Sequence, residues 1–183
     1  DVKCAYCDFF SIAQRHTDDD TWRRYLDRLK HDLAHQFGLL STDTAHPVLG
    51  SIFFGGGTPS KAPAYVVAGI IEAILGSFTN KVSAVEVTAE ANPESLTQEL
   101  LAAWRSAGIN RVSVGMQSLD EATLRYLGRL YRPQAYAQVF ARVRAAGFEN
   151  YSADFITGVP GQSEQSTLRD LQFAIGEGVT HVS

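Results

Sequence analysis

Residues 48–90, VLGSIFFGGGTPSKAPAYVVAGIIEAILGSFTNKVSAVEVTAE, decide the fold class. The segment opens with an apolar run at 48–54, which has the length of a buried strand and ends in three glycines. The pattern then predicts a helix over 64–78 and a second strand over 84–90. A strand, a helix and another strand in succession are typical of a βαβ unit, whose two strands lie parallel in one sheet.

The same alternation continues on both sides of this segment. Further helices are expected at 20–37, 95–107, 119–130, 134–146 and 164–177, and further strands at 111–116, at 151–157 and around His181. Ser95 is the expected N-cap of the helix at 95–107, and Gly108 its C-terminal stop. These elements predict one α/β domain with a parallel sheet and outer helices. Periodicity alone leaves open whether the sheet is doubly wound or part of a barrel.

Composition sets limits on the function. The chain has 183 residues, of which 45% are hydrophobic, enough for one domain with a sizeable core. The formal net charge of −4 argues against a nucleic-acid partner, which would need a basic face. No apolar run approaches the roughly 20 residues of a membrane span. The only two cysteines stand together near the N-terminus, which fits a reducing cytosol, so a cytoplasmic location is expected.

Polar residues and glycines gather where the predicted strands end. Gly55-Gly56-Gly57-Thr58 follows the first strand, and Glu90, Gln117 and Asp154 stand at the ends of later ones. In either candidate fold, the carboxyl ends of parallel strands meet at one edge, where ligand sites form. We therefore expect these residues to share one site.

The pair Cys4 and Cys7 has three interpretations when taken alone. It could be a redox dithiol, although the residues after Cys7 do not read as a helix. It could bind zinc, but zinc needs about four ligands and the chain has no second C-x-x-C. His31 and His35 could supply two further ligands from one helix face, although histidines on a charged helix are more often solvated. The third interpretation is an iron–sulfur cluster held by thiolates.

Cys4-Ala5-Tyr6-Cys7 resembles the end of the C-x3-C-x-aromatic-C motif of radical S-adenosylmethionine (SAM) proteins. The resemblance implies that Cys4 and Cys7 ligate a [4Fe–4S] cluster and that the third cysteine immediately precedes Asp1. It also implies that SAM binds the open fourth iron. An electron from the cluster would then cleave SAM to a 5′-deoxyadenosyl radical.

Five further segments match motifs of the oxygen-independent coproporphyrinogen III oxidase family, in family order. They are Gly55-Gly56-Gly57-Thr58-Pro59-Ser60, Glu90-Ala91-Asn92-Pro93, Gly115-Met116-Gln117-Ser118, Leu127-Gly128-Arg129, and the stretch from Asp154 to Gln162. By this resemblance the SAM site comprises Tyr6, Gly56, Gly57, Thr58, Glu90, Gln117, Arg129 and Asp154. The implied fold is a partial (β/α)6 radical SAM barrel. Residues 1–183 would be a single core domain, cut from a longer protein and lacking the first strand and the C-terminal region.

The family contains two branches with different activities. Its oxidases decarboxylate coproporphyrinogen III to protoporphyrinogen IX and carry another cysteine where this chain has Phe9. Cys7-Asp8-Phe9 resembles instead the haem-chaperone branch, which binds haem and transfers it to acceptor proteins. We therefore expect a haem chaperone with an electron donor and acceptor proteins as partners. The alternatives are the oxidase, with a porphyrinogen substrate, and another radical SAM methyltransferase or cyclase.

Tyr131 departs from the family pattern, which has histidine two positions after the arginine of the LGR motif. A tyrosine can donate a hydrogen bond but cannot gain a proton near neutral pH. Its expected role is that of a packing aromatic residue.

Overall fold

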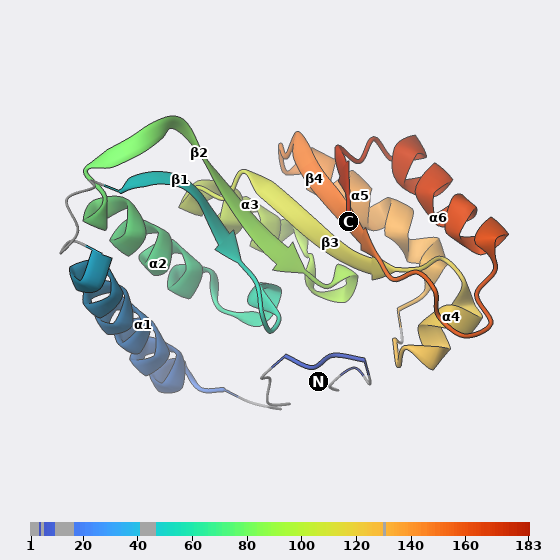
Figure 1. Cartoon of the computed structure of the whole chain (residues 1–183), viewed down its shortest axis with the longest axis horizontal. Helices are drawn as coiled ribbons and strands as arrows, with labels where there is room; N and C mark the ends of the chain where they lie inside the picture. Colours follow the sequence, from blue (N-terminus) through green and yellow to red (C-terminus); the bar gives the residue numbers. More distant parts are fainter. Residues whose placement is uncertain (1–3, 5, 10–16, 41–46, 130) are drawn as a thin grey trace.

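A parallel sheet of five strands runs through the computed structural model, which describes residues 4, 6–9, 17–40, 47–129 and 131–183 (Figure 1). The strands lie side by side in chain order, and each pairs in parallel with the next. They are β1 (Val48–Phe54), β2 (Asn80–Ala91), β3 (Arg111–Gln117), β4 (Asn150–Phe155) and β5 (His181–Val182). Because the strands are parallel, their carboxyl ends meet at one edge of the sheet.

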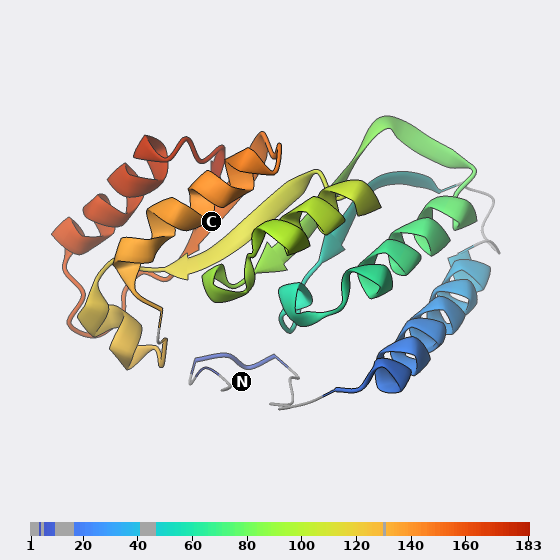
Figure 2. The same cartoon turned by 180° about the vertical axis from the view of Figure 1, so that it is seen from behind.

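Helices cover one face of this sheet (Figure 2). They are α2 (Ala64–Ser77), α3 (Gln98–Ala107), α5 (Tyr136–Ala145) and α6 (Glu164–Gly176). α1 (Asp19–Leu40) packs against α2, and α4 (Glu121–Tyr126) lies beyond the carboxyl end of β3. The short 3-10 helices are η1 (Pro59–Lys61), η2 (Pro93–Ser95) and η3 (Pro133–Ala135). No helix of the described residues covers the opposite face, which is turned to the viewer in Figure 1. The predicted α/β class, with a parallel sheet and outer helices, is confirmed.

The apolar core lies between the sheet and its helices. In β3, Val112, Val114 and Met116 are fully buried, because alternate residues of a strand point to the same face. Full burial of side chains of this size stabilises the fold by roughly 1.5–3 kcal/mol each. Ser113 and Gly115, which lie between them, and Gln117, which follows Met116, belong to the face that no described helix covers. The strand pattern therefore fixes both the core and the polar surface on which the site is built.

The start of α3 corrects one sequence expectation. Ser95 ends the 3-10 helix η2 instead of capping α3, which begins at Gln98. The N-cap is Thr97, whose hydroxyl accepts a hydrogen bond from the backbone N–H of Leu100 at 3.2 Å. The predicted stop at Gly108 is confirmed, since this residue takes a left-handed φ of 102°.

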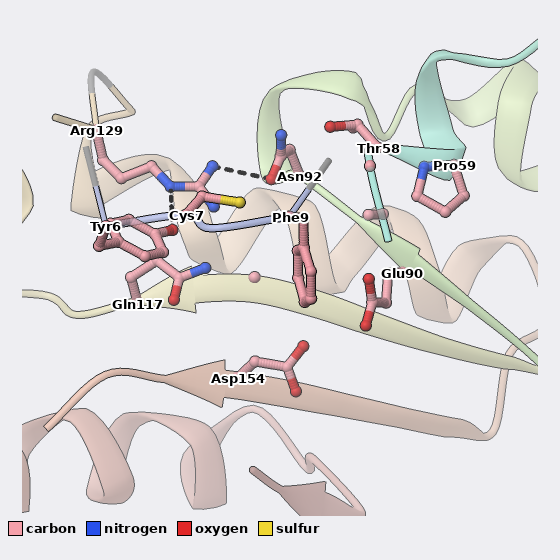
Figure 3. Close-up of a pocket in the computed structure, with 13 residues that line it drawn as sticks. Tyr6, Cys7, Phe9, Thr58, Pro59, Glu90, Asn92, Gln117, Arg129 and Asp154 are labelled. Atoms are coloured by element: carbon pink, nitrogen blue, oxygen red, sulfur yellow. Dashed lines mark hydrogen bonds between the residues drawn. The ribbon is translucent and has the colours of Figure 1, made fainter. Parts of the chain in front are cut away.

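The helix predicted at 119–130 is much shorter in the structure. Asp120 caps α4 by accepting a hydrogen bond from the backbone N–H of Thr123 at 2.7 Å, so the helix starts later than predicted. The chain then takes a left-handed turn at Gly128, with φ of 73°, and α4 has already ended at Tyr126. The loop that follows carries Arg129 towards the carboxyl edge of the sheet (Figure 3).

Among the described residues, no helix combines the length and apolar character needed to cross a membrane.

Candidate functional site

A cavity of about 190 Å³ opens at the carboxyl edge of the sheet, beside the N-terminal segment (Figure 3). Its walls come from β2, β3, β4 and the turns that follow the strands. Eight of the residues predicted for the site line it: Tyr6, Cys7, Gly57, Thr58, Glu90, Gln117, Arg129 and Asp154. Pockets that bury a ligand of drug size are typically 300–1,000 Å³. The described walls therefore enclose only part of a ligand as large as SAM.

Glu90, the penultimate residue of β2, lies close to the glycine turn that follows β1. A Cβ atom at Gly55 would lie 3.0 Å from the Glu90 carboxylate and 2.7 Å from the Phe53 ring, so glycine is needed for this approach. Burial raises the pKa of Glu90, and the negative charge of Asp154 raises it further. A hydrogen bond from the backbone of Gly56 opposes both effects. Glu90 thus holds a partly desolvated carboxyl that a bound cation would favour in its ionised form.

Gln117 has an unusual backbone for a residue with a side chain. Its φ of 68° lies in the left-handed region, and the pairing of β3 with β4 shifts register between Gly115 and Gln117. A Cβ atom at Gly115 would lie 2.8 Å from the Gln117 side-chain nitrogen. The amide therefore occupies space over the strand that only a glycine leaves open. Strained backbone of this kind is concentrated at functional sites.

Arg129 connects the N-terminal segment to the turn after β2 (Figure 3). Its Nε donates a hydrogen bond to the Tyr6 hydroxyl at 3.1 Å, and a terminal nitrogen donates one to the Asn92 side-chain oxygen at 2.8 Å. The guanidinium carbon also lies 6.0 Å from the centre of the Tyr6 ring. Arg129 therefore places a fixed positive charge beside the cavity.

Asp154 ends a row of polar side chains on the open face of the sheet. Both its carboxylate oxygens accept from the Ser113 hydroxyl, at 2.9 and 2.8 Å. Ser113 in turn lies 2.7 Å from the hydroxyl of Ser152, which accepts from Arg111 at 3.3 Å. Burial raises the pKa of Asp154, while the Ser113 hydrogen bonds and the charge of Arg111 lower it. The row thus fixes the orientation of the carboxylate.

The two cysteines form a turn next to the cavity. The backbone N–H of Cys7 donates to the carbonyl of Cys4 at 3.1 Å, and both thiols are half-buried and free of disulfides. Cys7 lines the cavity, whereas Cys4 does not. Within the described ranges, no group of three His, Cys, Asp or Glu side chains is arranged to hold a metal. Two thiols are too few to hold a metal centre, so Cys4 and Cys7 could serve as ligands only together with a further residue.

The structure separates some predicted residues and adds others. Gly56 lies outside the cavity lining but bonds Glu90 through its backbone. Five lining residues were not predicted as site residues: Phe9, Pro59, Ala91, Asn92 and Gly115. All five stand within or next to the quoted motifs, so their position in the sequence was the available signal. Tyr131, expected to pack, lies with its ring 5.2 Å from that of Tyr136.

Comparison with known proteins gives a family match over almost the whole chain. The model described as the radical SAM superfamily matches residues 1–174. The chain is 34% identical over 182 residues to "Heme chaperone HemW" of Mycobacterium tuberculosis and 32% identical over 183 residues to that of Escherichia coli. It is also 35% identical over 181 residues to a mitochondrial "Radical S-adenosyl methionine domain-containing protein 1" of Bos taurus. These alignments cover 100%, 99% and 99% of this chain but only 45%, 46% and 39% of the relatives.

Solved structures support the barrel fold. The chain superimposes on Escherichia coli coproporphyrinogen III oxidase (HemN), described as a radical SAM enzyme, with a TM-score of 0.78. The sequence identity is 22%, and the match covers 97% of this chain and 39% of that one. Methanocaldococcus infernus Elp3 matches with a TM-score of 0.63 at 15% identity, covering 84% of this chain and 39% of Elp3. The predicted partial radical SAM barrel is therefore confirmed as the fold.

Proposed function

Because the chain belongs to the radical SAM superfamily, we propose that its cavity binds SAM beside a [4Fe–4S] cluster. Cys4 and Cys7 would hold the cluster, together with a cysteine immediately before Asp1. When bound, the cluster supplies the electron that cleaves SAM. Residues 1–183 would form one core domain of a protein about twice as long, since the chain spans less than half of the curated relatives.

The charges around the cavity support this assignment. SAM carries an ammonium and a sulfonium, both positive, and a carboxylate. Glu90 and Asp154 supply two carboxylates, and Arg129 supplies the one guanidinium in the lining. Opposite charges within about 4–6 Å favour each other's ionised form. Binding of a cation would therefore offset the burial that raises the pKa of Glu90 and Asp154.

The remaining proposed contacts come from the turn after β1, the Gln117 amide and the Tyr6 side chain. Gly56, Gly57 and Thr58 form the turn after β1, where glycines let the backbone approach a ligand closely. Gln117 presents an amide that can both donate and accept. The Tyr6 hydroxyl accepts a hydrogen bond from Arg129 and would position its guanidinium.

For the whole protein we propose a haem chaperone that passes haem to acceptor proteins. The observation that carries this proposal is Phe9, which stands where the resembled oxidases have a further cysteine. Its ring points into the same cavity as Glu90 and Asp154 (Figure 3), and its exposed fraction is 59%. Relatives named as heme chaperones, 32–34% identical across the chain, support the same assignment. An electron donor is a further proposed partner.

An anaerobic assay of the full-length protein tests this proposal against the oxidase alternative. The protein would be supplied with reductant, SAM and coproporphyrinogen III, and protoporphyrinogen and 5′-deoxyadenosine would be measured. In parallel, haem binding and transfer to an apo-acceptor would be followed by absorbance. We expect haem binding and transfer without porphyrinogen turnover. Repeated formation of protoporphyrinogen would establish the oxidase instead. Slow SAM cleavage without porphyrin change would leave the chaperone proposal standing, because it needs only the cluster site.

A further inference from the structure

The turn around Gln117 is held by hydrogen bonds from three other parts of the chain. The Tyr136 hydroxyl, on α5, donates to the carbonyl of Met116 at 2.6 Å. The backbone N–H of Ile156, after β4, donates to the carbonyl of Gln117 at 3.0 Å. Asp170, on α6, accepts from the backbone N–H of Leu119 at 2.7 Å. The left-handed backbone of Gln117 is therefore held by hydrogen bonds to residues before and after it.

Asp170 is the charged member of this set. Its second carboxylate oxygen accepts from the Ser118 hydroxyl at 2.9 Å, and only 2% of the residue is exposed. Ser118 also accepts from the backbone N–H of Asp120 at 3.0 Å. Burial raises the pKa of Asp170. Of the charged groups nearby, Asp120 raises this pKa further and Arg169 lowers it. Burying a carboxylate costs free energy unless it is hydrogen-bonded. Both carboxylate oxygens of Asp170 bond the same turn, which indicates that this residue serves to hold the turn.

Neither Tyr136 nor Asp170 lines the cavity. Tyr136 bonds Met116 near the end of β3, and Asp170 bonds Ser118 and Leu119 just after that strand, so the two side chains hold the chain on either side of Gln117. Tyr136 lies on α5 and Asp170 on α6, and these two helices lie side by side on the helix-covered face of the sheet (Figure 2). A residue with φ near 68° returns to the β region unless its surroundings hold it. Such a return would rotate the Gln117 side chain away from Gly115 and the cavity.

We propose that Tyr136 and Asp170 are positioning residues, which hold the Met116–Leu119 turn so that Gln117 faces the cofactor cavity. The effect on SAM rests on the proposed function, whereas the effect on the turn does not. If the turn samples other conformations, the apparent SAM affinity falls in proportion to the fraction that remains competent.

Two matched tyrosine variants of the full-length protein give the first test. Tyr136→Phe removes the hydroxyl that bonds Met116. Tyr151→Phe removes the hydroxyl of another buried tyrosine, which bonds the carbonyl of Glu177 at 2.9 Å near the amino end of β4, away from the cavity. Amide hydrogen exchange over residues 115–119 would be measured without SAM, and the dissociation constant of SAM would be measured after cluster reconstitution.

We expect Tyr136→Phe to speed exchange in this segment and to weaken SAM binding about threefold to tenfold, the usual effect of losing one neutral hydrogen bond. Tyr151→Phe should leave both unchanged. Equal exchange and equal affinity in the two variants would overturn the proposal. Absence of SAM binding by the wild-type protein would refute the proposed function, while the exchange comparison would still decide the positioning role.

Asp170 gives a second test through a conservative variant. Asp170→Ala removes both bonds and should weaken SAM binding tenfold or more, since bonds to a charged group are the stronger ones. Asp170→Asn should recover most of the affinity, because its amide can accept from Leu119 and donate to Ser118. Wild-type affinity in Asp170→Ala would contradict the proposal, as would an Asp170→Asn variant no better than alanine despite normal secondary structure.

Discussion

Replacing Arg129 by lysine keeps the positive charge beside the cavity but removes the planar guanidinium. In the structure this group donates two hydrogen bonds, to Tyr6 at 3.1 Å and to Asn92 at 2.8 Å. A lysine ammonium is a compact point charge and does not reproduce the fixed fork of an arginine. We expect it to keep at most one of the two contacts and to loosen the N-terminal segment against the turn after β2.

The size of the effect follows from the lost hydrogen bond. Bonds to charged groups contribute about 1.5–3 kcal/mol each, and the bond to Tyr6 is exposed, so the lower end applies. A loss of about 1.4 kcal/mol of binding free energy corresponds to a dissociation constant ten times larger. We therefore expect Arg129→Lys to bind SAM about tenfold more weakly than the wild-type protein.

Calorimetric titration of SAM into the anaerobically reconstituted full-length protein measures this change. The control is Arg125→Lys, because Arg125 lies exposed on α4, where its side chain bonds the carbonyl of Glu121. This variant should bind SAM normally, and the iron content of all three proteins should agree. A wild-type dissociation constant in Arg129→Lys would refute the assignment of Arg129 to the SAM site.

Three further predictions concern other residues of the site. Cys4→Ala or Cys7→Ala in the full-length protein should abolish retention of about four irons per chain, measured after anaerobic reconstitution; a stable zinc content without charge-transfer absorbance would contradict the cluster. Ser113→Ala should raise the pKa of Asp154 further, because the Ser113 hydrogen bonds lower it. A larger fraction of the carboxyl is then protonated at each pH, so the acid-side loss of SAM affinity should begin at a higher pH than in the wild type; an unshifted profile would count against a role for ionised Asp154. Gly115→Ala should displace the Gln117 amide, 2.8 Å from the added carbon, and weaken SAM binding, whereas Gly76→Ala, with open space around it, should not; equal affinities would argue against the placement of Gln117.

Much of the fold could be predicted because its signals are local. The strand at 48–54 matches β1 residue for residue, since a short apolar run followed by glycines leaves little choice. The gathering of Glu90, Gln117 and Asp154 followed from parallel topology alone, because all three lie at or next to the carboxyl ends of strands in one sheet. Their assignment to SAM came from resemblance and remains a prediction.

Other features depend on partners distant in the sequence, which no local pattern reveals. Asn92 holds Arg129 across 37 positions, and Asp170 reaches Leu119 across 51. The left-handed backbone of Gln117 was equally hidden, because glutamine has no preference for it. The predicted cap at Ser95 was wrong because two hydroxyl residues compete there: Ser95 is buried and bonds the carbonyl of Asn92, which leaves Thr97 to start α3.

The claim that this site holds a cluster with SAM on its open iron is tested most directly by electron paramagnetic resonance. The spectrum of the reduced, anaerobically reconstituted full-length protein would be recorded before and after addition of SAM. We predict a [4Fe–4S]⁺ signal whose g values change as SAM is added, because a new ligand alters the surroundings of the iron. A signal that stays the same at saturating SAM, or no cluster signal in a protein that is folded and loaded with iron, would contradict the account.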